Sequence, residues 1–127
     1  MSMRFRRDAD LIVVPTLVWG PAGHTSARLV LDTGAAASTL GWGVLVSVGY
    51  APEAATEQVH LATASAVEFV PRIRVQKLQA LGRERRDLPI VCHNLPPSAG
   101  VDGVLGLDFL RGQRLVVDFR AGLVSLD

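Results

Sequence analysis

The stretch that most constrains the fold of this chain is Leu29–Leu40, which reads LVLDTGAAASTL. It begins with three apolar residues, which is typical of a buried β-strand, and this strand runs directly into Asp32. A carboxylate at the end of a buried strand is costly to desolvate unless it has hydrogen-bond partners. Gly34 allows the backbone to turn sharply, and the alanines that follow leave room beside the acid. The stretch therefore predicts a strand that carries one acidic group into a tight loop.

A second segment, Gly103–Leu110, lies near the C-terminus and reads GVLGLDFL. Asp32–Ala35 after its apolar lead-in, followed far downstream by Val104–Gly106, resembles the two signatures of the aspartic proteases. The tripeptide Asp-Thr-Gly alone should occur by chance in roughly 1% of chains of this length, so the joint match carries the resemblance. The short chain with a single copy of the tripeptide is similar to the retroviral-type, or retropepsin-like, branch, and the resemblance extends over residues 11–126.

This resemblance implies a mainly β fold, namely a closed β-barrel of the acid-protease type with a flap hairpin and one or two short helices. A chain of 127 residues is one domain by size, so the domain is expected to occupy residues 1–127, with 1–10 as an arm or an edge strand. Apolar residues make up 49% of the chain and aromatic residues only 6%. The core is therefore expected to consist mostly of valine, leucine and alanine.

The chemistry of such a site needs two carboxylates. One ionised carboxylate takes a proton from water while a protonated one donates a hydrogen bond to the substrate carbonyl, and two acids this close share a proton. Asp32 is the only aspartate of the chain that precedes Thr-Gly. The second carboxylate is therefore expected from Asp32 of another copy across a two-fold axis, which predicts a homodimeric endopeptidase acting on a peptide or protein substrate.

The resemblance also implies roles for the residues around Asp32. Thr33 would bond to the neighbouring loop across the axis, Gly34 would present its carbonyl to substrate, and Ser38 would support the loop. Ala36 stands where viral relatives carry an acidic residue, so their ion-pair network is not expected here. No metal or other cofactor is implied. The expected site residues are catalytic Asp32; the loop residues Thr33, Gly34, Ala35 and Ser38; the second signature Val104, Leu105 and Gly106; and the flap tip Thr63, Ala64, Ser65 and Ala66.

The pattern of apolar and turn residues places further elements along the chain. The flap has no glycine between Gly49 and Gly82, so its tip is expected to be stiffer than in relatives, or differently shaped. The predicted elements are a hairpin of Leu11–Trp19 and Thr25–Leu31, a helix over Trp42–Val48, the flap hairpin within Glu57–Leu78, a charged turn at Gly82–Asp87, strands at Leu88–Cys92 and Val101–Leu105, a short helix over Leu107–Leu110, and a final hairpin of Leu115–Phe119 and Leu123–Leu126.

Composition argues against several other classes of protein. A formal net charge of +1 gives no electrostatic case for nucleic acid or an anionic membrane as partner. No apolar run approaches the ~20 residues of a membrane span. The N-terminus does not resemble a signal peptide, because Asp8 and Asp10 interrupt its basic and apolar residues. Cys92 is the only cysteine, so no intrachain disulfide can form, and a reducing, cytoplasmic location is expected.

Three other interpretations remain open. The Asp-Thr-Gly tripeptide can be a plain turn after a strand, since aspartate and glycine are common turn residues. The same barrel can serve as a binding module that holds a peptide without cleaving it, which the glycine-free flap favours. The pattern apolar-Asp-x-Gly-x-x-x-Ser also resembles the phosphate loop of actin-like ATPases, but the two large lobes of that fold need a longer chain.

Several other polar residues are interpreted as structural. Asp102 and Asp108 are expected to begin a turn and a helix rather than to act in catalysis. Cys92 is expected to be a buried, small apolar residue. The histidines, which lack the spacing of metal ligands, are His24, His60 and His93. The arginines expected in a solvated turn are Arg83, Arg85 and Arg86.

Overall fold

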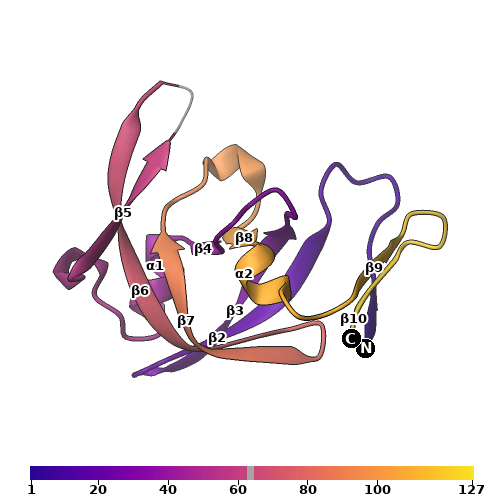
Figure 1. Ribbon diagram of the computed structural model, residues 1–127, viewed down its shortest axis with the longest axis horizontal. Coiled ribbons are helices and arrows are strands. Elements are labelled where there is room, and N and C mark those ends of the chain that lie inside the picture. Colours follow the sequence, from indigo (N-terminus) through magenta and orange to yellow (C-terminus); the bar gives the residue numbers. More distant parts are fainter. Residues whose placement is uncertain (63–64) are drawn as a thin grey trace.

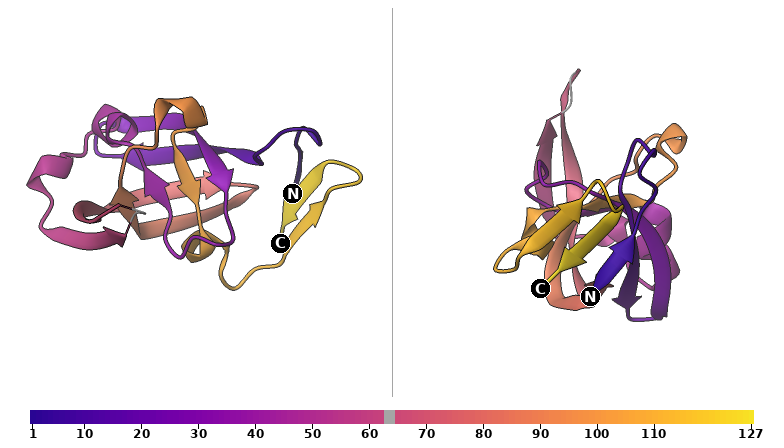
Figure 2. Two further views of the ribbon diagram at one scale, coloured as in Figure 1. Left: turned by 90° about the horizontal axis from the view of Figure 1, so that it is seen from above. Right: turned by 90° about the vertical axis from the view of Figure 1, so that its right-hand side faces the viewer.

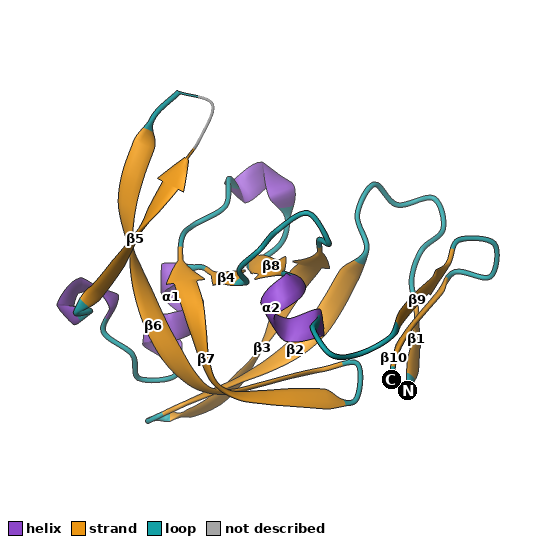
Figure 3. Cartoon of the chain, viewed as in Figure 1, coloured by secondary structure: helices purple, strands orange, loops and turns teal. Residues whose placement is uncertain are grey.

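The computed structural model describes residues 1–62 and 65–127, and over these residues the chain is mainly β with short helices (Figure 1, Figure 3). The strands are β1 (Ser2–Arg4), β2 (Val13–Gly20), β3 (Gly23–Leu31), β4 (Thr39–Leu40), β5 (Glu57–Ala62), β6 (Val67–Ala80), β7 (Arg83–Cys92), β8 (Gly103–Leu105), β9 (Leu115–Asp118) and β10 (Leu123–Leu126). The helical segments are α1 (Trp42–Ser47), α2 (Leu107–Leu110) and the 3₁₀ turns η1 (Pro52–Ala54) and η2 (Pro97–Ala99).

Six strands close into a barrel. The larger sheet has the order β2-β3-β8-β4-β7-β6-β5, and β2 also pairs with β6, where Leu17 lies opposite Gln79 and Trp19 opposite Lys77. This additional pairing joins the two sides, so that β2, β3, β8, β4, β7 and β6 form a ring. The strand β5 extends beyond the ring on β6, and the β5–β6 hairpin projects from the barrel in Figure 1. The closed, mainly β barrel expected from the sequence is confirmed.

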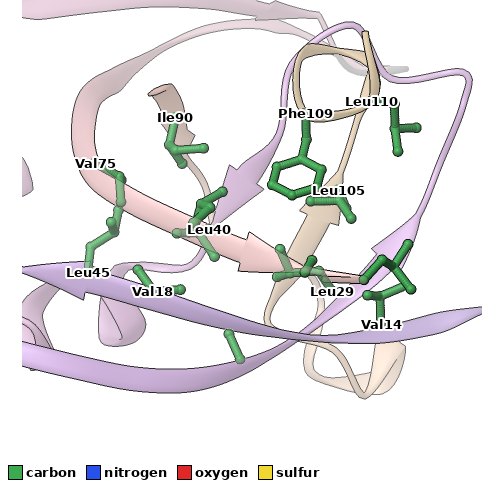
Figure 4. Close-up of a cluster of buried hydrophobic side chains, with 14 of the residues drawn as sticks. Val14, Val18, Leu29, Leu40, Leu45, Val75, Ile90, Leu105, Phe109 and Leu110 are labelled. Atoms are coloured by element: carbon green, nitrogen blue, oxygen red, sulfur yellow. The ribbon is translucent and has the colours of Figure 1, made fainter. Parts of the chain in front are cut away.

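The alternation of apolar residues explains which strand faces form the core. In β2, Val14 and Val18 are fully buried, whereas Pro15 and Leu17 between them are exposed. Successive side chains of a strand point to opposite faces, so a period of two buries one face. Fully burying a side chain of this size contributes about 1.5–3 kcal/mol to stability. Both α-helices also place buried side chains in this core, so its burial stabilises their packing against the barrel. Large residues that meet inside it (Figure 4) include Leu29, Leu40, Leu45, Leu105 and Phe109.

The predicted charged turn at Gly82–Asp87 is wrong. The chain reverses at Leu81 and Gly82, whose φ angles are 53° and 74°, and β7 begins immediately afterwards, opposite β6. Charged residues at this end of β7 are mostly exposed, so they pair in the sheet without entering the core. The predicted strand Leu88–Cys92 is therefore only the better buried half of a longer strand. The predicted helices and the first and final hairpins are confirmed, with small shifts of their ends.

A second, smaller sheet joins the two ends of the chain beside the barrel (Figure 2). Its strand order is β1-β10-β9, and both pairings are antiparallel. The rings of Phe5 and Phe119 meet edge to face, with their centroids 5.9 Å apart. Both the first and the last strand of the chain are therefore held in one sheet, outside the barrel that carries the candidate site.

Candidate active site

Asp32 lies just beyond the end of β3, where β3 runs parallel to β8. Its backbone N–H donates to the carbonyl oxygen of Leu105, 3.0 Å away. One side-chain oxygen, Oδ1, accepts the backbone N–H of Gly34 at 2.8 Å. Asp32 is exposed, and within the described part of the chain its other oxygen accepts no hydrogen bond. The carboxylate is thus oriented by its own loop and keeps one oxygen available to another molecule.

Glycines let this loop pack directly against the segment that follows β8. A Cβ atom on Gly106 would lie 2.7 Å from the carbonyl oxygen of Ala35, a distance that real side chains do not tolerate. A Cβ atom on Gly34 would lie 3.1 Å from Oδ1 of Asp32 and would crowd the carboxylate. The close approach allows the N–H of Leu107 to donate to the carbonyl of Ala35 at 2.8 Å. The two segments that the sequence analysis singled out are therefore in direct contact.

Ser38 and Asp108 form a hydrogen-bonded support beneath the loop. The hydroxyl of fully buried Ser38 donates to Oδ1 of Asp108 at 2.6 Å and accepts the N–H of Gly106 at 2.9 Å. The N–H groups of Ser38 and Phe109 also donate to the Asp108 carboxylate, at 2.9 and 2.8 Å. From the sequence only a helix start is expected for Asp108, and this contact is missed. Ser38 and Asp108 lie 70 positions apart, and no local pattern in the sequence relates them.

A cavity of about 550 Å³ opens beside Asp32. This volume is within the range of ordinary ligand sites, which are mostly apolar with a few placed polar groups. The loop contributes small side chains, and β5, β7 and β8 contribute larger apolar ones. Its lining includes Ala36, Ala37, Val59, Leu61, Val91 and Val104. The arrangement places one oriented carboxylate at the wall of a mainly apolar cavity.

The β5–β6 hairpin forms one side of this cavity and stands where the flap is expected (Figure 1). Val59 and Leu61 of β5 line the cavity together with residues of the Asp32 loop. The expected tip residues Thr63 and Ala64 lie outside the described residues. Ser65 and Ala66 lie between the two strands and are exposed. The described part of the hairpin therefore lies next to Asp32 and contributes to the wall of the cavity.

The remaining expected residues fall into the same cluster. Thr33 is exposed, and its hydroxyl makes no hydrogen bond to any described residue of its own chain. Ala35 and Val104 line the cavity. Leu105 is fully buried in the core next to the loop. The structure thus brings together the loop residues and the second signature, which are far apart in the sequence.

Other reactive side chains lie outside this cluster. Within residues 1–62 and 65–127, no three His, Cys, Asp or Glu side chains are placed to hold a metal ion. Cys92 is fully buried, and burial raises the pKa of its thiol to about 11, so it is a poor nucleophile near neutral pH. His24 stacks on Trp19, and His60 packs edge-on against Phe69. None of the helices in the described residues has the length and apolar character to cross a membrane.

Comparisons with known proteins agree with this geometry. A search of curated proteins finds no match to the chain. The crystal structure of a retropepsin-like aspartic protease from Rickettsia conorii has a similar fold, with a TM-score of 0.73 at 16% sequence identity, over 99% of this chain and 88% of that chain. A family model described as gag-polyprotein putative aspartyl protease matches residues 22–112, which contain the Asp32 loop and the second signature. The chain therefore belongs to this family of retropepsin-like aspartic proteases.

Proposed function

We propose that this chain is an aspartic endopeptidase that works as a homodimer, in which Asp32 of each copy supplies one half of a catalytic pair. The observation that carries the proposal is the exposed Asp32 carboxylate, oriented by the N–H of Gly34 at the wall of a cavity of about 550 Å³. The loop that holds it is supported by the buried Ser38 hydroxyl.

The second carboxylate of the pair has to come from another copy. Asp108 also lines the cavity and is the other acid there among the described residues. Both of its oxygens already accept hydrogen bonds, from the hydroxyl and N–H of Ser38 and from the N–H of Phe109. Because both oxygens are engaged in supporting the loop, we assign Asp108 a structural role.

In the proposed dimer, the two Asp32 side chains share one proton across the two-fold axis. The ionised one accepts a proton from water as that water attacks the peptide carbonyl, and the protonated one donates a hydrogen bond to the carbonyl oxygen. The exposed hydroxyl of Thr33 would bond to the partner's loop, and the carbonyl of Gly34 would bind substrate backbone. These roles need no metal or cofactor.

Cleavage of casein or of a peptide library near pH 4–6 tests the proposal. Asp32→Asn is expected to lower kcat/KM by at least about 100-fold, since it removes the general acid–base pair. Asp8→Asn is the control, because Asp8 is exposed and forms only a loose ion pair with Arg6. If Asp32→Asn cleaves as fast as the wild type, the proposed mechanism is wrong. Tight peptide binding without cleavage by the wild type would instead support the binding-module alternative.

A further inference from the structure

Arg72 is the only lysine or arginine among the described residues that line the cavity beside Asp32. It belongs to β6, at the base of the hairpin, where it lies opposite Val91 of β7 and Glu57 of β5. Its side chain is 42% exposed, and together with Glu57 it also lines a neighbouring pocket. This position puts a positive charge at the wall of a mainly apolar cavity.

The ion pair of Arg72 leaves part of the guanidinium unused. Nε donates to Oε2 of Glu57 at 2.8 Å, and Nη2 forms an ion pair with the same oxygen, also at 2.8 Å. The other terminal nitrogen, Nη1, has no partner among the described residues. The Glu57 side chain is 46% exposed, and ion pairs this open to solvent contribute little to stability. A further carboxylate can therefore approach Nη1 without breaking a strong interaction.

Among the described residues that line the cavity, the acids are Asp32 and Asp108, and Arg72 is the one lysine or arginine. The Asp108 carboxyl group already accepts hydrogen bonds from Ser38 and Phe109. His60 lines the cavity and packs against Phe69. The loop also contributes the small, uncharged Ala36 and Ala37 to the lining, so Asp32 is the one acid of the loop that faces an acidic ligand there.

We propose that Arg72 is a specificity-determining residue that selects substrate peptides with an aspartate or glutamate near the apolar residues at the scissile bond. This inference rests on the proposed peptidase function of the same cavity. The substrate carboxylate accepts hydrogen bonds from Nη1 of Arg72, while Glu57 keeps the other edge of the guanidinium. In a two-fold symmetric dimer, each copy contributes one Arg72, so the preference is expected on both sides of the scissile bond.

The test uses matched peptides that differ only by glutamate or glutamine at one position flanking an apolar pair. The wild type is expected to cleave the glutamate peptide with a kcat/KM about fivefold higher at the position nearest Arg72, and the ratio should fall with added salt. Arg72→Gln is expected to bring the ratio to about one. Glu57→Gln removes the competing anion and is expected to increase it. Arg74→Gln is the control, because Arg74 donates to the carbonyl of Asp87 and does not line this cavity.

Binding of the same peptides to the Asp32→Asn protein separates this inference from the proposed function. If the wild type cleaves both peptides equally at every position, Arg72 does not select and the inference is wrong, while the peptidase function stands. If nothing is cleaved but the glutamate peptide binds more tightly in an Arg72-dependent way, the selectivity stands and the peptidase function fails. If neither peptide is cleaved or bound, both proposals are overturned.

Discussion

At the residue scale, the hydroxyl of Ser38 serves two partners, since it donates to Asp108 and accepts from the N–H of Gly106. Ser38→Ala leaves both partners without this bond in a buried site, where an unsatisfied group costs about 1–3 kcal/mol. We expect the free energy of unfolding in urea to fall by about 2–3 kcal/mol. Ser47→Ala is the control, because that exposed hydroxyl bonds only within α1. Equal losses in the two variants would contradict the support role of Ser38.

Two glycines of different surroundings give a second residue-scale prediction. At Gly106, an added methyl group meets backbone at 2.7 Å, so Gly106→Ala must displace the catalytic loop. At Gly43 in α1, nothing lies within 4 Å of the added group. We expect thermal unfolding to show a loss of about 1–3 kcal/mol for Gly106→Ala and a gain of about 0.5–1 kcal/mol for Gly43→Ala. Unchanged or increased stability of Gly106→Ala would show that the contact at Gly106 relaxes freely.

Residues whose role depends on their sequence neighbours could be predicted from the sequence. Residues whose role depends on contacts between distant segments could not. The Asp32 loop could be predicted because the residues that define it, an apolar strand, an acid and a glycine, follow one another in the sequence. Asp108 acts through Ser38, 70 positions earlier, and no local pattern relates the two. The structure supplies that contact through the antiparallel pairing of β4, which follows Ser38, with β8, which precedes Asp108.

At the element scale, β7 shows how tertiary contacts override a local charge pattern. Arg85 belongs to the segment predicted as a solvated turn, yet its Nε donates to the carbonyl of Phe109 at 3.0 Å and its Nη2 donates to the carbonyl of Arg111. These are carbonyl groups at the end of α2, where a cation is favourable. Arg85 of β7 therefore satisfies carbonyl groups at the C-terminal end of α2, the helix that follows the second signature. The sequence alone does not indicate this contact.

One side chain, that of Tyr50, bridges the two strands whose pairing closes the barrel. The hydroxyl of Tyr50 donates to the carbonyl of Trp19 on β2 and accepts the N–H of Gln76 on β6, both at 2.8 Å. This bridge lies next to the β2–β6 pairing that makes the ring. Tyr50→Phe removes both bonds and is expected to lower the free energy of unfolding by about 1–2 kcal/mol at neutral pH. Unchanged stability would mean that the strand pairing alone closes the barrel.

The same hydroxyl gives a pH prediction. Desolvation raises the pKa of Tyr50 above its ordinary value of 10.0. A raised pKa in the folded state means that the stability from Tyr50 is present below about pH 10 and is lost as the pH rises further. Tyr50 is the only tyrosine of the chain, so tyrosinate absorbance reports it directly. We expect its midpoint above pH 10.0 in the folded protein, and a shallower alkaline loss of stability in Tyr50→Phe. A midpoint at or below the ordinary value would contradict the burial argument.

At the scale of the whole molecule, the fold is complete in one chain and the proposed catalytic pair is not. The barrel closes through β2 and β6 of the same chain, and both ends of the chain join one sheet. Folding is therefore expected to persist in a monomer, whereas hydrolysis by the proposed mechanism needs two copies of Asp32. On dilution below the dimer Kd, specific activity should fall while the circular dichroism spectrum stays constant. Constant specific activity at concentrations where sedimentation gives a monomer mass would contradict the shared pair.

Mixing subunits tests the shared pair more directly than dilution does. If each active dimer needs two intact Asp32 carboxylates, one Asp32→Asn subunit inactivates its wild-type partner. After unfolding and refolding an equimolar mixture, about a quarter of the dimers contain two wild-type subunits, so activity per wild-type subunit should fall to about half. An excess of the variant should lower it further, whereas in mixtures with Asp8→Asn protein, whose substitution lies in an exposed ion pair, the activity per total subunit should stay at the wild-type value. Activity that depends only on the amount of wild-type chain would mean that each copy works alone, and Asp32 would then need a different partner acid.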